Sequence, residues 1–146
     1  MSIPATKQPR GIRNHNPGNI RKSPTAWQGE VPGDDDLFET FATAEHGLRA
    51  IGRLLLNYQS KHGLNTVRQI IDRWAPPSEN DTDQYVDHVA KRCGVGPDEH
   101  ISIAQHLREL MRAIVRHENG NPGGSGDWYT PETYDRAVAM ALGKVA

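Results

Sequence analysis

The sequence predicts a single, mainly α domain of five to six helices with at most a small β-hairpin. Three observations support this fold class. Apolar residues recur at three- and four-residue spacing in several stretches after residue 43. Capping residues and glycines bound these stretches, and Asn, Pro and Gly, which are typical of loops, gather in residues 11–36. The length of 146 residues is the usual size of one domain.

The N-terminal part of the chain is expected to be poor in regular structure. Residues 1–10 are predicted to form a flexible tail, because Pro4 and Pro9 stand among residues with little to bury. The domain then covers residues 11–146. Short extended segments are predicted at residues 19–21 and 37–41, where apolar and polar residues alternate.

Capping signals predict the first two long helices. Thr43 begins a helix that ends at Gly63. Thr66 begins a shorter helix, which Pro76 and Pro77 stop because proline cannot continue a helix.

Three further helices follow in the second half of the chain. The first begins at Asp81 or Thr82 and closes at Gly94. The next covers residues 103–118, and the last begins after Thr130 with a proline at its first position.

Composition limits the classes of function. The formal net charge is −1, which disfavours a nucleic-acid or membrane-surface binder. No apolar run is long enough to span a bilayer, and no apolar segment follows the first cations as a secretory signal requires. Cys93 is alone, so an internal disulfide is excluded. The seven His lack the spacing of a metal site, and no metal or organic cofactor is expected.

Glu118 is the main candidate for catalysis. It follows Ile114 by four residues and Val115 by three, so it lies on or beside the apolar face of the 103–118 helix. The negative end of the helix and an apolar wall would both raise the pKa of this carboxyl, which suits a general acid. The alternative is a solvated Glu at a fraying helix end.

Other polar residues compete for a role in a site. Asn14, Asn16 and Asn19 offer donors and acceptors that suit sugar hydroxyls, although Asn also makes turns by bonding its own backbone. Trp27 follows closely and would stack on a sugar. Tyr85 is either a core residue or a site hydroxyl.

Two further carboxylates are secondary candidates. Glu79 follows the Pro-Pro-Ser segment and ranks second as an acid, while Glu30 lies beside Trp27. Asp81 is expected to cap a helix rather than to catalyse.

Five motifs resemble a family of phage and prophage proteins described as virion-associated. They are Gly11-Ile12-Arg13-Asn14 leading into Asn16-Pro17-Gly18-Asn19-Ile20, Trp27-Gln28-Gly29, Trp74-Ala75-Pro76, Glu79-Asn80-Asp81-Thr82 and Arg116-His117-Glu118-Asn119-Gly120. This resemblance covers the chain from Arg10 to about Gly120.

A second resemblance is to lysozyme-like peptidoglycan hydrolases, the lytic transglycosylases and glucosaminidases. In those enzymes a catalytic Glu ends an apolar helix, and Ala113-Ile114-x-x-x-Glu118-Asn119-Gly120 is similar. Asn16-Pro17-Gly18-Asn19-Ile20 and Thr82-Asp83-Gln84-Tyr85 resemble two later motifs of the glucosaminidase branch. The Glu helix comes first in the enzymes and last here, which a circular permutation would reconcile.

The resemblance implies that this is a phage enzyme that cleaves the glycan strand of peptidoglycan, as a lytic transglycosylase or muramidase. Glu118 would be the single acid and base, with Asn14, Asn16, Asn19, Trp27 and Tyr85 binding sugar. Without a secretory signal, the protein would be made in the host cytoplasm and reach the periplasmic wall in the virion or through a membrane lesion at lysis. The alternative is a non-catalytic virion protein that binds cell wall or a tail component.

Overall fold

The computed structural model describes residues 8–76, 81–123 and 126–145. Across these residues the chain forms six helices and one two-stranded antiparallel sheet, which confirms the predicted mainly α class. In chain order the elements are α1 (Arg10–Arg13), β1 (Glu30–Val31), β2 (Thr40–Phe41), α2 (Ala44–His62), α3 (Val67–Trp74), α4 (Thr82–Cys93), α5 (Ile103–Asn119) and α6 (Pro131–Ala141).

Side-chain caps fix the starts of the five long helices, and four of these caps are at residues that the sequence predicts. The side chains of Thr43, Thr66, Asp81 and Thr130 each accept a backbone N–H three residues later. Ser102 does the same for α5. α2 and α4 end at glycines in the left-handed conformation. Glycine adopts this conformation without steric strain because it has no Cβ atom.

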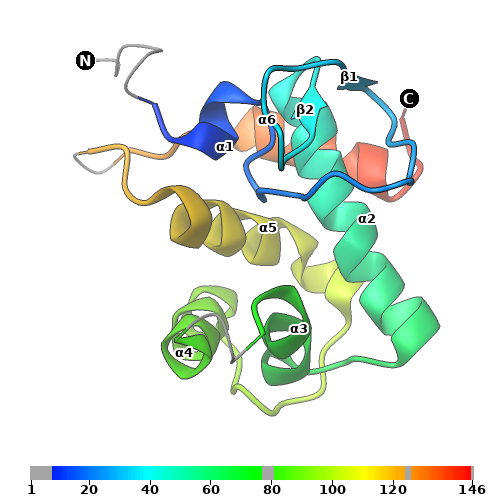
Figure 1. Ribbon diagram of the computed structural model, residues 1–146. Coiled ribbons are helices and arrows are strands. Elements are labelled where there is room, and N and C mark those ends of the chain that lie inside the picture. Colours follow the sequence, from blue (N-terminus) through cyan, green and yellow to red (C-terminus); the bar gives the residue numbers. More distant parts are fainter. Residues whose placement is uncertain (1–7, 77–80, 124–125, 146) are drawn as a thin grey trace.

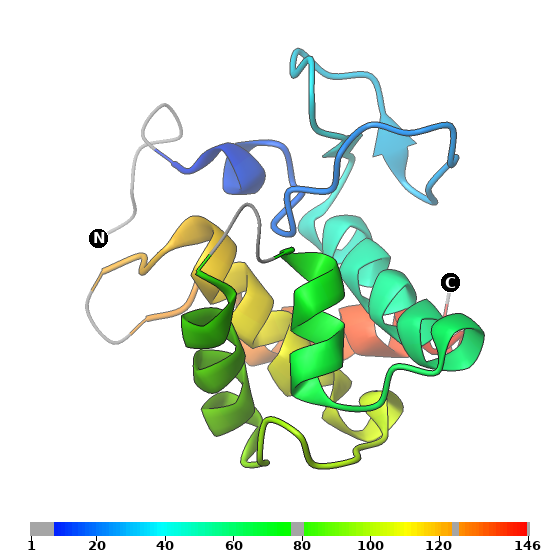
Figure 2. The same cartoon turned by 60° about the horizontal axis from the view of Figure 1, so that its bottom comes forward.

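α5 is the central helix of the fold. It packs against α2 and α6 on one side and against α4 on the other, while α3 packs on α4 (Figures 1 and 2). The inward faces of α2 and α5 are fully buried, and burial of such apolar side chains is the main driving force for folding. None of the described helices is long and apolar enough to cross a bilayer.

The N-terminal segment, residues 8–42, lies over one end of α2 and α5 (Figure 1). Its hairpin pairs Glu30 with Phe41 and Val31 with Thr40. The predicted extended segment at residues 37–41 therefore contributes β2, but the segment at residues 19–21 makes only an isolated bridge, Arg21 to Phe38. The sequence does not predict β1, because its two exposed residues between a glycine and a proline are too few for an alternating pattern.

The sequence does not predict α1 either, because four residues carry no helical periodicity. Arg10, its first residue, forms an ion pair with Asp35 in the long loop. The helix packs tightly on α5: a Cβ on Gly11 would lie 2.6 Å from Asn119 Oδ1 and 2.8 Å from Asn19 Oδ1. Glycine is therefore required where the N-terminal segment meets the end of α5.

Candidate active site

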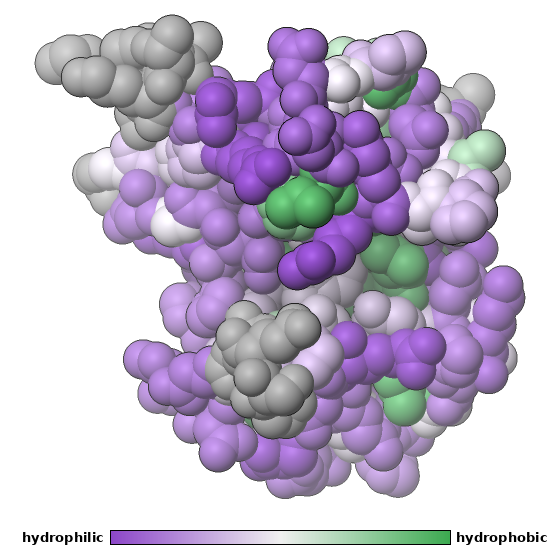
Figure 3. Space-filling model, in the orientation of Figure 1, coloured by the Kyte–Doolittle hydropathy of each residue, from purple (hydrophilic) through white to green (hydrophobic). Residues whose placement is uncertain are grey.

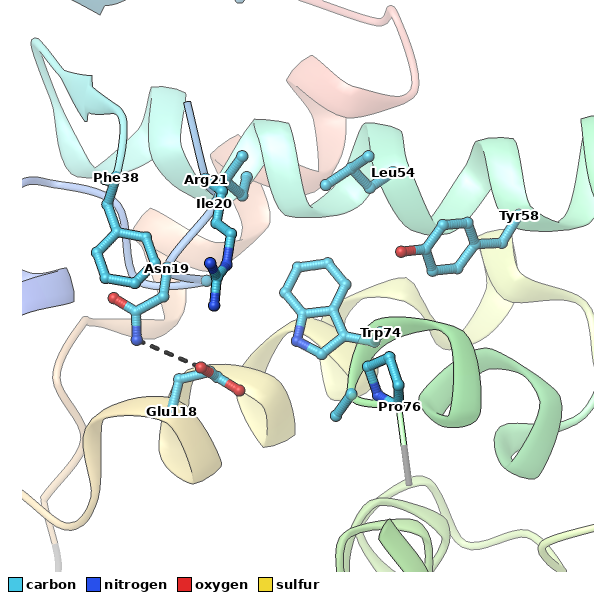
Figure 4. A pocket seen from close by; sticks show the side chains of 11 residues that line it. Asn19, Ile20, Arg21, Phe38, Leu54, Tyr58, Trp74, Pro76 and Glu118 are labelled. Atoms are coloured by element: carbon cyan, nitrogen blue, oxygen red, sulfur yellow. Dashed lines mark hydrogen bonds between the residues drawn. The ribbon is translucent and has the colours of Figure 1, made fainter. Parts of the chain in front are cut away.

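A cleft of about 320 Å³ opens between the N-terminal segment and helices α2, α3 and α5. Figure 3 shows a depression in this face of the molecule, with hydrophobic side chains bordered by hydrophilic ones. Figure 4 shows its walls: Asn19, Arg21 and Phe38 stand on one side and Trp74 and Pro76 on the other. Glu118 lies at the base, between the two walls.

The Glu118 carboxylate is held by donors from two distant segments. Asn19 Nδ2 donates to Oε1 at 3.3 Å, across 99 residues of sequence, and the Tyr85 hydroxyl donates to Oε2 at 3.3 Å. Tyr85 is fully buried, and its ring stacks on His117 with centroids 3.5 Å apart. The glutamate therefore faces both predicted partners rather than open solvent.

Burial raises the pKa of Glu118 above its ordinary value. The donors Asn19, Tyr85 and Trp74 lower the pKa in part because they stabilise the charged form, but burial prevails. The pKa of Tyr85 is raised by its own burial and by the charge of Glu118, so its hydroxyl stays protonated and remains a donor. The site thus holds a carboxyl group that protonates more readily than an exposed glutamate.

The turn at residues 16–19 aims Asn19 at the carboxylate. Asn19 adopts a φ of +50°, in the left-handed region that Asn tolerates better than most residues. Asn16 closes this turn: its Nδ2 donates to the carbonyls of Ile20 at 3.0 Å and Glu39 at 2.9 Å, and its Oδ1 accepts from Ile20 N–H. The role of Asn16 is therefore to hold the loop, since its side chain is fully buried.

Asn119 ties the end of α5 to the same turn. Its Nδ2 donates to the carbonyl of Pro17 at 2.8 Å and to that of Val115 at 2.9 Å. Because Asn119 directly follows Glu118, this bond fixes the catalytic candidate against the loop that carries Asn19. The sequence marked Asn119 only as a residue of the motif.

Three of the remaining predicted residues, Asn14, Trp27 and Glu30, do not line the cleft. Asn14 donates to Asp35 at 3.0 Å, and Trp27 lines a different groove beside α2. Glu30 is exposed in β1, where its charge helps to raise the pKa of the buried Glu39, after burial itself. Glu79 lies outside the described residues.

The aromatic wall of the cleft is Trp74 instead of Trp27. Trp74 ends α3, and its ring lies close to Gly18: a Cβ added there would be 3.1 Å from Trp74 Cζ2. Arg21 and Phe38, which also line the cleft, are joined by the isolated bridge and by a cation–π contact of 5.9 Å. The motif Trp74-Ala75-Pro76 was the available signal for this wall.

The described parts of the chain hold no group of three His, Cys, Asp or Glu side chains placed to bind a metal ion. Among the described residues that line the cleft, Glu118 is the single carboxylate. The chemistry that this arrangement offers is proton transfer from a half-buried acid to a molecule held between Trp74 and Arg21.

Fold and site together define a small, mainly helical domain with one half-buried acid at the base of a cleft. No family model matches the chain. Over 130 residues it is 38% identical to Protein P5 of Pseudoalteromonas phage PM2, a match that covers 86% of this chain and 76% of that protein. The chain therefore belongs to the same family as this phage protein.

Proposed function

We propose that this protein cleaves the glycan strand of bacterial peptidoglycan with Glu118 as its single general acid and base. The observation that carries the proposal is the environment of Glu118: half-buried, raised in pKa, and placed at the base of a cleft with an aromatic wall. An acid of this kind can hold its proton until a leaving group needs it. The aromatic face of Trp74 suits the apolar face of a sugar ring.

The proposed reaction follows from one carboxyl group. Protonated Glu118 donates its proton to the glycosidic oxygen as the bond from the anomeric carbon to that oxygen breaks. The resulting carboxylate then takes the proton of a hydroxyl on the same sugar, and that oxygen forms the new bond to the anomeric carbon. A conventional hydrolase uses two carboxylates, whereas Glu118 is the single carboxylate among the described residues that line the cleft.

The contact between α1 and α5 supports the resemblance to lysozyme-like enzymes, of which this chain would be a circular permutant. In those enzymes the Asn-containing segment follows the Glu helix directly in sequence. Here the two are distant in sequence but touch in space, because Gly11 packs on Asn119 at the end of α5. A connection from the end of α5 to the start of α1 would give the enzyme order, and the two elements are already in contact.

Mass spectrometry of digested peptidoglycan tests this proposal. Purified protein is incubated with sacculi, and the soluble fragments are analysed. We expect fragments that end in an anhydro sugar, since the attacking hydroxyl belongs to the substrate. Fragments with ordinary reducing ends would indicate hydrolysis in place of this mechanism. The absence of fragments would overturn the enzymatic proposal.

Tyr85→Phe should shift the pH dependence of cleavage. The hydroxyl stabilises the carboxylate of Glu118, so its loss should raise the pKa of Glu118 further and move the alkaline limb of activity to higher pH. The change in rate should stay within about tenfold, the scale of one hydrogen bond. Tyr134→Phe removes a hydroxyl bonded to Asp127 and should leave the profile in place. An unshifted Tyr85→Phe profile would contradict the assigned role of this bond.

The alternative is a phage virion component that holds cell wall or a tail protein without cleaving it. The phage relative favours this class as a second candidate. The same cleft would then bind glycan, and Glu118 would only accept hydrogen bonds. Cleavage by the unsubstituted protein separates the two, because a holding protein releases no fragments from sacculi.

A further inference from the structure

A second groove lies along α2, beside the cleft that holds Glu118. It has a volume of about 450 Å³, and Trp27 and Gln28 of the N-terminal segment form one of its walls. Arg49, Arg53 and Lys61 line it from α2. We call it the basic groove. Leu54 lines both the basic groove and the cleft, so the two adjoin at this residue.

The polar residues of α2 in this groove form a ladder. Arg49, Arg53, Asn57 and Lys61 follow one another at four-residue spacing, which places them along one side of the helix. Twelve residues of helix span about 18 Å. An extended peptide of about five residues has the same length.

The charge of the ladder lacks a counterpart within the described parts of the chain. None of the residues that line the groove is acidic. No described carboxylate lies within ion-pair distance of Arg49, Arg53 or Lys61, and this includes Glu45, one turn before Arg49. Burial and the neighbouring charge of Arg53 both lower the pKa of Arg49. Like charges at this spacing destabilise a helix, and a bound anion would relieve that cost.

We infer that the basic groove binds the carboxylates of the short acidic peptides that peptidoglycan carries on its sugars. This inference rests on the proposed function, because it requires the glycan strand to lie in the cleft. The strand would then pass Trp74 and Glu118 while its peptide follows α2. A nucleic acid is the less suitable ligand, because the chain has a net charge of −1 and the groove offers only three cations.

Binding to two forms of the wall tests the groove separately from the chemistry. Glu118→Gln is used as the parent protein, so that substrate is not consumed. Its binding to intact sacculi is compared with its binding to glycan strands stripped of peptide by an amidase. Arg49→Gln with Lys61→Gln is then added, while Arg53 is kept because its Nη1 donates to the carbonyl of Ala141 at 3.0 Å.

The double substitution should weaken binding to intact sacculi by about tenfold, the order expected from removing two partly exposed charges. Binding to stripped strands should be unchanged, and the difference should shrink as salt is added. Lys91→Gln with Arg92→Gln removes the same charge from α4 and should leave both bindings as they were.

Three results would overturn the proposed role of the basic groove. The parent and the double variant could bind intact sacculi equally well, the double substitution could weaken binding to both substrates equally, or the parent could fail to bind intact sacculi. Salt-dependent binding of duplex DNA that the double substitution abolishes would identify a nucleic acid instead. Cleavage by protein with an intact Glu118 is measured in parallel. If the protein prefers intact sacculi to stripped strands but cleaves neither, the proposed chemistry is refuted and the proposed role of the basic groove is retained.

Discussion

Glu118→Gln should reduce the release of soluble fragments from peptidoglycan by about 10²- to 10⁴-fold, the range that a general acid contributes. Gln keeps the shape of the side chain, and its single amide oxygen can still accept one of the two hydrogen bonds that Asn19 and Tyr85 donate to Glu118. It has no proton of suitable acidity to donate. Loss of cleavage with retained fold would therefore report on chemistry alone, and the measurement is fragment release from purified sacculi.

Glu132→Gln is the matched control, because Glu132 is an exposed residue in the first turn of α6. It removes the same charge and should leave cleavage unchanged. Full activity of Glu118→Gln would sink the catalytic assignment. Equal loss in both variants would point to net charge instead of a specific acid.

Glu118→Gln should also change the pH dependence of stability. Because the pKa of Glu118 is raised on folding, the folded state favours the protonated form. Its contribution to stability is fully present below the unfolded pKa and is lost as pH rises through the folded pKa. Gln stays neutral, so the variant should be at least as stable as the unsubstituted protein at neutral pH. The advantage should vanish in acid, which thermal unfolding at two pH values would show.

Local signals explain why most of the fold could be predicted. Thr43, Thr66 and Thr130 cap helices through their own side chains, and Gly63 and Gly94 end helices by their own backbone conformation. Such features need no knowledge of the rest of the chain. β1 and α1 are set by packing of the N-terminal segment on α2 and α5. With two and four residues, they are too short to show a periodic pattern in the sequence.

Site residues could be predicted only where helix periodicity or the family resemblance indicated which residues surround them. Glu118 stood out by its place on an apolar face, and the resemblance joined it to Asn19 and Tyr85. The sequence favours Trp27 over Trp74 because Trp27 is near the Asn-rich loop along the chain, whereas the fold brings α3 to the cleft. Asn16 and Asn19 are three residues apart and of the same type. Only the tertiary structure shows that one closes the turn and the other faces the acid.

Asn16→Asp should destabilise the protein by about 3 kcal/mol, because the buried carbonyl of Glu39 loses the donor Asn16 and an unmet buried group costs about 1–3 kcal/mol, while the carbonyl of Ile20 keeps the N–H of Glu39. A charged oxygen would also face the carbonyls of Ile20 and Glu39 without compensation. Such a loss is a large share of the ordinary stability of a domain. Urea denaturation at neutral pH measures it. Asn121→Asp is the control, since exposed Asn121 accepts a bond from Gly123 N–H and Asp accepts equally well.

The pH dependence of this loss identifies its cause. Burial would raise the pKa of the carboxyl group that Asn16→Asp introduces, so the stability deficit should be largest at neutral pH and should shrink as acid restores one donor to the side chain. A sugar-binding Asn16 would behave differently. Substitution would then lower the affinity for glycan and leave the urea midpoint unchanged at every pH, which would contradict the buried position of this side chain. The turn that presents Asn19 to Glu118 depends on Asn16, so unfolding and loss of cleavage should follow the same pH course in this variant.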